Sequence, residues 1–415
     1  MEKGVNFFDL KKKNRKQILL AIKNYGALPR KDISNIINLT PAAVTIITNE
    51  MKDEGILCEL GQQVESNKRV GRKKTLIDIN YNSKYIVGVS IESDTISIGL
   101  CNLKGEILDN QEFDTPLKIS KSELDILRLI NDTCINLFWK NNVKKQDVLG
   151  MGIGIIGSVD NLNGISKNAY DIFEKNTPIK NLLEKQLNIS VCIDNNVRTL
   201  AMAEIDFKSS ETIENNMIFV KYGPGIGTAI VIDNEIYEGT NNNAGELGHI
   251  IVKPHGELCK CGKKGCLETV ASPNAIFIET KKIFSKDKTP FLYKITEGNP
   301  ENIDLLHIIE SSKNGDKNID IILDGAAFYF ALALSTAITL YDPKQVVLYG
   351  EAFDYNFFID KLKWYLNDIP GNTSMTDIIR VSSVGYKYKF LGGVALALKK
   401  FFYDEGGKIL IESVN

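Results

Sequence analysis

The chain has 415 residues, of which 43% are hydrophobic and 25% are charged. That length exceeds one ordinary domain, so two or three domains with buried cores are expected. No run of apolar residues approaches the ~20 needed to span a bilayer. The N-terminal segment lacks the apolar core of a secretion signal. These features argue against a membrane-spanning or secreted protein and predict a cytosolic one.

The net charge of -2 conceals an asymmetry along the chain. Residues 1–80 carry 15 Lys and Arg against 9 Asp and Glu, and the remainder carries 35 against 43. A basic N-terminal part and an acidic remainder predict that only the N-terminal part, the head, binds a polyanion. Chance surface charge is the alternative explanation.

The basic head has the pattern of three helices followed by a β-hairpin. Helical spacing of apolar residues predicts helices at 14–25, at 30–37 and from Pro41 to just before Gly55. Thr40 is a good N-cap for the third helix and Pro41 a good first residue. In that helix Val44, Ile47 and Met51 are expected to face inward. The alternating stretches ILCEL and TLIDI predict the hairpin, with a long, mobile basic tip between them.

This order of elements is typical of a winged helix-turn-helix, whose third helix enters the major groove of DNA. Thr and Asn can hydrogen-bond to bases, Ala and Pro can contact a thymine methyl group, and a basic tip suits a narrow minor groove. The alternative is a three-helix protein-interaction module with a solvated basic loop. The residues expected to bind DNA are Thr40, Pro41, Ala42, Thr45, Thr48 and Asn49 in the helix, and Arg69, Arg72 and Lys73 in the tip.

From about residue 83 onward, strands alternate with helices, which predicts an α/β architecture. A meander of strands begins near residue 85 and is followed by a helix at 122–140. A similar meander with a glycine turn begins near residue 217, and a clear strand lies at 345–350. The recurrence of this pattern indicates two related lobes.

Three of the seven cysteines, Cys259, Cys261 and Cys266, lie within eight residues of one another. Three thiolates and one imidazole suit a closed, tetrahedral, structural zinc site. Spacing alone leaves the fourth ligand open between His249 and His255. A set of unliganded buried thiols is the alternative, and the other four cysteines have the pattern of core residues in a reducing compartment.

The segments GELGH (245–249) and CKCGKKGCLE (259–268) resemble the signature of the ROK family of repressors and sugar kinases. GIGIIGSVD (152–160), Asp194-Asn195-Asn196 and LGGVALAL (391–398) are similar to further family motifs. The resemblance implies an α/β fold with a two-lobed, actin-like ATPase body (81–415) and a cleft between the lobes. The winged helix-turn-helix head (1–80) resembles that of the family's sugar repressors.

The resemblance also implies roles for individual side chains. Glu246, His249 and Glu268 match positions that hydrogen-bond to sugar hydroxyls, with His249 also ligating zinc beside Cys259, Cys261 and Cys266. Asp194 matches the general base of the family's kinases, and Asn196 follows it on the same turn. Carboxylates accept strong hydrogen bonds from hydroxyls, so these residues are expected to bind a sugar.

The nucleotide site departs from the kinase pattern. The family's first phosphate turn reads Asp-x-Gly-Gly-Thr, whereas residues 90–94 read SIESD. Ser90 replaces the Asp, and neither glycine is present. Glu92 would place a negative charge beside the phosphate, which opposes binding. In the second turn, GPGIG (223–227), Pro224 removes one N–H donor. ATP binding is therefore not expected. Ile156, Ile193 and the segment 168–170 also depart from the family's sugar site, which favours a pentose such as xylose or a short oligosaccharide.

We therefore expect a sugar-responsive transcriptional repressor of carbohydrate metabolism genes, not an enzyme, acting as a homodimer or tetramer on operator DNA. Sugar binding is expected to close the lobes and move a linker near residues 75–85. Two alternatives stay open. One is an active sugar kinase with a regulatory head, and the other is a repressor controlled by a partner protein.

Overall fold

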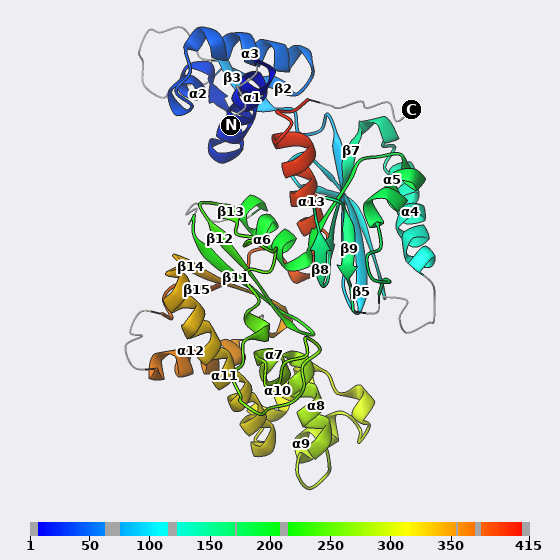
Figure 1. Cartoon of the computed structure of the whole chain (residues 1–415), viewed down its shortest axis with the longest axis vertical. Coiled ribbons are helices and arrows are strands. Elements are labelled where there is room, and N and C mark those ends of the chain that lie inside the picture. The colour runs from blue at the N-terminus through cyan, green and yellow to red at the C-terminus, as the bar shows by residue number, and fades with distance from the viewer. Residues whose placement is uncertain are drawn as a thin grey trace. The chain divides into compact units, whose positions relative to one another are not determined.

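The computed structural model describes residues 7–62, 75–114, 123–170, 172–207, 215–353, 356–369 and 375–408. It divides into two compact units (Figure 1). Unit 1 comprises residues 1–203 and 389–415, and unit 2 comprises residues 204–388. The predicted domain boundary at residues 80 and 81 stays a prediction.

The N-terminal part of unit 1 contains the predicted helices and hairpin. The helices are α1 (Phe7–Tyr25), α2 (Arg30–Ile36) and α3 (Pro41–Asp53). The strands are β1 (Leu28–Pro29), β2 (Leu57–Gln62) and β3 (Thr75–Ile79), paired antiparallel in the order β1-β3-β2. Helix α1 begins seven residues earlier than predicted. Its first turns are rich in lysine, which favours helix but carries no apolar period.

The start of α3 confirms the predicted cap. The Thr40 hydroxyl accepts a hydrogen bond from the Ala43 N–H at 3.2 Å, and Pro41 is the first helical residue. Val44, Ile47 and Met51 are buried, as predicted.

The connection from this part to the rest of unit 1 is shorter than the predicted linker. Residues 75–79 are strand β3 and residue 85 already begins β4, so only residues 80–84 connect them. The backbone N–H of Asn80 donates to Ile56 O, and that of Leu103 donates to Tyr81 O. The connection therefore lies within the predicted range near residues 75–85, whose first five residues form β3, the predicted strand TLIDI.

Each unit contains one five-stranded sheet of identical topology. In unit 1 the order is β10-β7-β4-β5-β6, and in unit 2 it is β13-β12-β11-β14-β15. The first three strands of each sheet are an antiparallel meander, and two parallel strands are added beside the first of them. This confirms the predicted recurrence of one lobe pattern.

The strands of the unit 1 sheet are β4 (Tyr85–Ile91), β5 (Thr95–Asn102), β6 (Ile107–Asp114), β7 (Val148–Ile155) and β10 (Val191–Asn195), with a hairpin of β8 (Ser158–Asp160) and β9 (Ile165–Asn168). Those of unit 2 are β11 (Met217–Tyr222), β12 (Ile226–Ile232), β13 (Glu235–Ile236), β14 (Gln345–Tyr349) and β15 (Ile379–Val381). The remaining helices are α4 (Glu123–Lys140), α5 (Ile179–Leu187), α6 (Asn196–Phe207), α7 (Leu267–Ala271), α8 (Pro273–Ile283), α9 (Pro290–Ile295), α10 (Leu305–Lys313), α11 (Lys317–Tyr341), α12 (Asn356–Asp368) and α13 (Leu391–Ala397).

The two faces of the unit 1 sheet are built differently, because side chains alternate along a strand. In β7, Met151, Ile153 and Ile155 join the core under α4 and α5. The alternate positions Gly150, Gly152 and Gly154 face the other way. A Cβ at Gly152 would collide with the carbonyl oxygen of Gly393 in α13, so glycine lets this helix lie directly on the sheet (Figure 1).

The core of unit 2 is dominated by helix α11. This is the one helix of the described residues that is long and apolar enough to cross a membrane by length and composition. Its inner face is instead packed in the protein core, where Leu323, Phe330 and Leu334 are fully buried. Phe330 stacks on Tyr222 of β11.

Arg15 of α1 joins three segments of unit 1 that are distant in sequence. Its side chain is completely buried, and its two Nη atoms donate to the Glu54 carboxylate at 2.8 and 2.5 Å. Its Nε donates to the carbonyl oxygen of Gly406 at 2.7 Å. Glu54 is the C-cap of α3, so this one side chain ties α1 to the end of α3 and to the C-terminal turn.

Other contacts attach the same turn to α1. Lys12 pairs with Glu405 and Lys16 with Asp404, both at 2.7 Å. Lys23 lies over the ring of Tyr403 at 4.7 Å. We call residues Tyr403, Asp404, Glu405, Gly406 and Gly407 the C-terminal turn. The turn begins at the last residue of a π-helix (Leu398–Tyr403) that continues α13.

The variant Arg15→Met should destabilise the protein by about 2 kcal/mol, because it removes charge-assisted hydrogen bonds from a fully buried position. A lowered urea midpoint would show this. The exposed variant Lys13→Ala on the same helix is the control and should leave the midpoint unchanged.

The effect should also depend on pH. The Arg15 hydrogen bond holds the pKa of Glu54 below its ordinary value of 4.5. A depressed folded-state pKa stabilises the protein above the unfolded pKa and loses this contribution as the pH falls through the folded pKa. The difference in unfolding free energy between wild type and Arg15→Met should therefore have its full size at pH 7. It should become smaller below about pH 4.5. A gap that stays constant through this range would contradict the ion pair.

Candidate functional site

The outer face of α3 is uncharged along its first turns and carries both polar and apolar side chains. Of the predicted DNA-binding residues in this helix region, Thr40, Pro41, Ala42, Thr45 and Asn49 are exposed. Ile46 is also exposed, although no sequence signal singled it out. Its position beside Thr45 adds an apolar group to the same face.

The prediction that Thr48 is exposed was wrong. Its side chain is fully buried, and its hydroxyl donates to Val44 O at 2.8 Å and accepts from Arg30 Nε at 2.9 Å. Thr48 lies on the side of α3 that faces α2, one residue from the exposed position Asn49. Helical phase at the edge of the apolar stripe is hard to assign from spacing alone.

Arg30, at the start of α2, is a further residue of this surface that sequence reasoning missed. Its Nη2 donates to Asn49 Oδ1 at 2.9 Å and to Glu59 Oε1 at 3.2 Å. The Asn49 side chain is thereby oriented, with its amide nitrogen free to act as a donor toward a ligand. The predicted tip residues Arg69, Arg72 and Lys73 lie outside the described residues.

The predicted sugar residues fall into two sets, one in each unit. Asp194 and Asn196 belong to unit 1, at the end of β10 and the start of α6. Asp194 is buried, accepts from Asn195 N–H at 2.7 Å and pairs with Arg198 at 3.3 Å. Asn161, on the turn after β8, donates to its other oxygen at 3.4 Å.

Asn196 has a partner that the sequence did not indicate. Its side-chain amide donates to Glu92 Oε2 at 2.8 Å, and the Ser90 hydroxyl donates to Glu92 Oε1 at 3.2 Å. All three side chains are buried. The segment predicted to be a degenerate phosphate turn therefore holds an internal carboxylate, and this carboxylate is bound by the unit's own polar groups.

In unit 2, Glu268 and Glu246 differ in how firmly they are held. Glu268, in the short helix α7, accepts from the Ile226 N–H at 3.2 Å. A Cβ at Gly225 would collide with the Glu268 carboxylate, so the glycine turn between β11 and β12 fits closely against it. Glu246 is exposed, and its Oε2 lies 3.8 Å from His249 Nε2.

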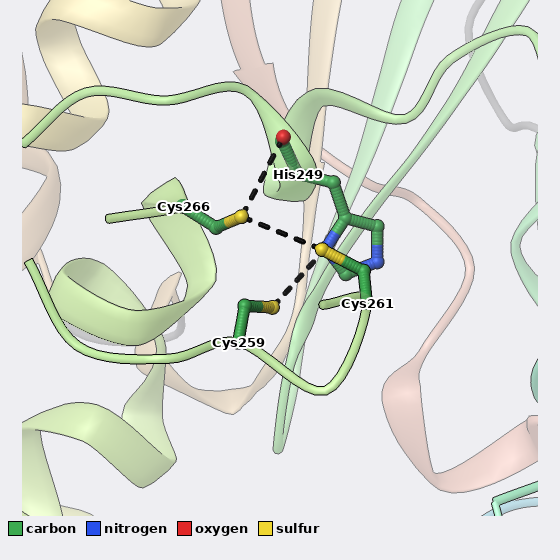
Figure 2. A group of neighbouring side chains, drawn as sticks. All are labelled: His249, Cys259, Cys261 and Cys266. Carbon is green, nitrogen blue, oxygen red and sulfur yellow. Dashed lines mark hydrogen bonds between the residues drawn. The ribbon is translucent and has the colours of Figure 1, made fainter. Parts of the chain in front are cut away.

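The three clustered cysteines and His249 converge on one point of unit 2 (Figure 2). One ligand atom from each of the four residues lies within 4.8 Å of all the others. The Cys261 and Cys266 sulfur atoms are 3.6 Å apart, and Cys259 Sγ is 3.6 Å from His249 Nδ1. This grouping includes His249 and leaves out His255, as the family resemblance implied.

The cluster has the geometry of a metal site. Around a tetrahedral ion with metal–sulfur bonds of about 2.3 Å, the sulfur atoms lie roughly 3.8 Å apart. The observed separations are close to this value. Gly262 and Gly265 both have positive φ and allow the short loop to return its cysteines to one point. His249, Cys259, Cys261 and Cys266 could together hold one metal ion.

Burial favours the neutral form of two of the thiols. Burial raises the pKa of Cys266 to about 12 and also raises that of Cys259. Without a cation these side chains are neutral thiols at pH 7, and a metal ion would replace their protons.

This chain is similar in sequence and in fold to known proteins. A model described as the ROK family matches residues 86–400. The chain is 27% identical to a xylose repressor of Caldicellulosiruptor bescii over 391 residues, which cover 94% of this chain and 96% of that protein. A solved ROK family transcriptional regulator, a homologue of the Escherichia coli Mlc protein, matches with a TM-score of 0.77 at 24% identity, covering 95% and 97% of the two chains. A ROK glucokinase from Streptomyces griseus, solved with glucose and AMPPNP, matches with a TM-score of 0.66 at 24% identity, covering 76% and 99%.

The paired five-stranded sheets and these structural matches define an α/β protein with an actin-like ATPase fold. The chain belongs to the ROK family.

The four-residue cluster leads to a quantitative prediction for the metal content of the protein. Wild-type protein should contain one equivalent of a transition metal by elemental analysis, and Cys261→Ser should lose it because one of four ligands is removed. Cys58→Ser is the control, since Cys58 lies in β2 of unit 1 and should not change the metal content. A full equivalent retained by Cys261→Ser would show that the cluster is not the site.

Proposed function

We propose that this protein is a sugar-responsive transcriptional repressor of carbohydrate metabolism genes, which binds operator DNA as a homodimer in the cytoplasm. Its N-terminal three helices and hairpin act as a winged helix-turn-helix. The ROK body binds a sugar, with a pentose such as xylose as the first candidate. The sugar changes the affinity of the head for DNA by binding two conformations unequally.

The outer face of α3 is the observation that carries this proposal. A helix that reads the major groove needs exposed side chains near its N-terminus that can hydrogen-bond to base edges or contact thymine methyl groups. Thr45 and Asn49 provide hydroxyl and amide groups, while Ala42 and Ile46 provide apolar contacts. The similarity to the xylose repressor extends over 94% of the chain, well beyond the matched family region at 86–400.

Sugar recognition is proposed for Glu246, His249 and Glu268 in unit 2, and for Asp194 and Asn196 in unit 1. Glu268 supports this role because the Ile226 N–H and the Gly225 turn fix its carboxylate in place. Asp194 is held by Arg198 and by a backbone N–H. A carboxylate that is already fixed in place can bind a hydroxyl group without having to reorganise.

Phosphoryl transfer is not part of the proposed function. A kinase binds phosphates with backbone N–H groups that glycine leaves accessible, and negative charge beside them opposes binding. The buried Glu92 carboxylate stands in this turn, bound by Asn196 and Ser90. Asp194 then acts as a hydrogen-bond acceptor and not as a general base.

The metal is proposed to be zinc in a structural role. Four protein ligands close the tetrahedron and leave no open position for a substrate. Bound there, zinc would orient the loop that carries His249 and Cys266, which directly precedes α7 and Glu268. The ion would thus stabilise the sugar residues of unit 2 indirectly.

Packing contacts within unit 1 connect its proposed sugar-binding residues to its proposed DNA-binding helix. Gly392 of α13 lies so close to α6 that a Cβ would meet the Thr199 hydroxyl at 2.7 Å. Helix α13 then continues through the π-helix to the C-terminal turn, which Arg15 ties to α1 and to the end of α3. We propose that a shift at the start of α6 reaches the recognition helix along this packed path.

DNA binding can be tested with fluorescently labelled upstream regions of neighbouring metabolic genes. The double variant Thr45→Ala/Asn49→Ala should bind about 100-fold more weakly, since each base contact contributes roughly 1–3 kcal/mol. The exposed residue Asp53 at the end of the same helix provides the control variant Asp53→Ala, which should keep its affinity. If wild-type protein shifts no native DNA fragment in the presence or absence of sugars, the repressor proposal is wrong.

Sugar binding can be tested by calorimetry with a panel of pentoses and hexoses. At least one sugar should release heat with wild-type protein, and Glu268→Gln should weaken it about tenfold or more by removing a charged acceptor. Glu310→Gln, exposed on α10 of the same unit, is the matched control.

An ADP-release assay with the same sugar panel addresses the rival kinase function. No turnover is expected. ATP-dependent turnover that disappears in Asp194→Ala would establish the kinase instead, and no heat with any sugar would favour control by a partner protein.

A further inference from the structure

Arg30 determines which atom of the Asn49 amide faces outward from α3. Arg30 is the first residue of α2, and its Nη2 donates to Asn49 Oδ1 at 2.9 Å. A guanidinium carries N–H donors and no acceptor, so only the oxygen of the Asn49 amide can face it. The amide nitrogen of this exposed side chain, with its two N–H donors, therefore points away from Arg30.

Two further contacts hold the Arg30 guanidinium in place. Its Nε donates to the hydroxyl of the buried Thr48 at 2.9 Å, and that hydroxyl donates in turn to Val44 O within α3. Its Nη2 also donates to Glu59 Oε1 at 3.2 Å, and Lys52 Nζ lies 3.3 Å from the same oxygen. The guanidinium thus joins α2, α3 and β2 (Figure 1) and is anchored independently of Asn49.

This anchor fixes the direction of the Asn49 amide. An asparagine amide normally turns about its last torsion and can present either its oxygen or its nitrogen to a ligand. Turning it beside Arg30 would replace a charge-assisted hydrogen bond by two donors that face each other. Asn49 therefore presents hydrogen-bond donors to whatever approaches the outer face of α3.

We infer that Asn49 reads a hydrogen-bond acceptor on a DNA base, and that Arg30 is the positioning residue that sets this preference. In the major groove guanine presents the acceptors N7 and O6, whereas cytosine presents only its N4 amino donor. Thymine offers one acceptor, and adenine offers an acceptor beside a donor. Guanine is therefore preferred opposite Asn49, and cytosine is the base that this side chain rejects.

Thr45 provides an internal reference on the same helix. It lies one turn before Asn49, about 6 Å along the helix axis, so the two side chains meet different base pairs. A threonine hydroxyl can donate or accept, and none of its hydrogen bonds involves Arg30: it donates to Pro41 O at 2.7 Å. The base preference set by Thr45 is thus independent of Arg30.

A direct contact with a DNA phosphate is the alternative role for Arg30, since its side chain is 23% exposed. Such a contact would strengthen binding to every sequence alike, and its loss would reduce the salt slope of the binding constant by about one. Positioning of Asn49 instead changes the preference at one base pair. The two roles are therefore separated by a base-by-base measurement.

This inference rests on the proposed function, because it names the class of base that the DNA-binding face selects. The test selects sites for the full-length protein from a library of randomised DNA duplexes and then measures the affinity for all four bases at each position. At one position wild type should bind a G·C pair about tenfold or more tightly than the same pair reversed to C·G. Asn49→Ala should abolish this discrimination and thereby identify the position.

Arg30→Ala should reduce the discrimination at that position to within about threefold, because the freed amide can turn its oxygen toward cytosine N4. The preference that Thr45→Ala removes at its own base pair should remain intact in Arg30→Ala. Lys31→Ala removes the same charge from the neighbouring exposed residue of α2 and should keep the full discrimination.

A second variant guards against misfolding of Arg30→Ala. Asn49→Asp preserves the shape of an exposed side chain, turns one oxygen toward Arg30 and presents the other as an acceptor. The preference should therefore invert, so that cytosine is bound best at this position, while the thermal midpoint stays close to wild type.

The inference and the proposed function fail in different ways. The inference is wrong if wild type binds cytosine as tightly as guanine at the position that Asn49→Ala identifies, or if Asn49→Ala changes no position. It is also wrong if Arg30→Ala weakens binding to all sequences by one factor and lowers the salt slope, since Arg30 would then contact a phosphate. The repressor function survives these results, whereas a selection that retains no duplex with or without sugars removes both.

Discussion

One buried guanidinium, that of Arg15, connects three segments of unit 1 that are distant in sequence. Arg15 has no access to solvent, so its charge is tolerated only because Glu54 and the carbonyl oxygen of Gly406 satisfy it. These partners belong to the end of α3 and to the C-terminal turn. The end of α3 is therefore linked through Arg15 to a residue that lies 391 positions beyond Arg15 in the chain.

The C-terminal turn is itself held by the sheet. Helix α13 lies on the glycine face of β4 and β7, where side chains larger than hydrogen would collide with its backbone. Close backbone packing of this kind leaves little freedom for the helix to slide. Sheet, α13, C-terminal turn and α1 form one packed series, and this series gives the proposed repressor a mechanical connection between its body and its DNA-binding face.

Much of this architecture could be predicted from the sequence. Most strands of both sheets are short and rich in apolar residues, and the duplicated meander was visible as a recurring pattern. The cap at Thr40 and the cluster of three cysteines with His249 also followed from residue types with narrow chemical roles. In each case the signal is local, or it belongs to a motif specific to the family.

The parts that could not be predicted depend on contacts between distant segments. The first turns of α1 have no apolar period, and the contact of Lys12 with Glu405 of the C-terminal turn is not visible in the local sequence. Thr48 was placed outside because spacing does not show that Arg30 of α2 reaches its hydroxyl. The Glu92–Asn196 hydrogen bond joins residues 104 positions apart.

The π-helix after α13 has a consequence for how the family can vary. A π-helix holds one more residue in its turn than an α-helix, so it rotates all that follows by roughly 100° about the helix axis. That rotation aims Tyr403 and Asp404 at α1. Losing a single residue between Leu398 and Tyr403 would restore a regular helix and point the acidic groups away from Lys12 and Lys16. The length of this segment is therefore under a stricter constraint than its composition, and insertions or deletions should be tolerated elsewhere before they are tolerated there.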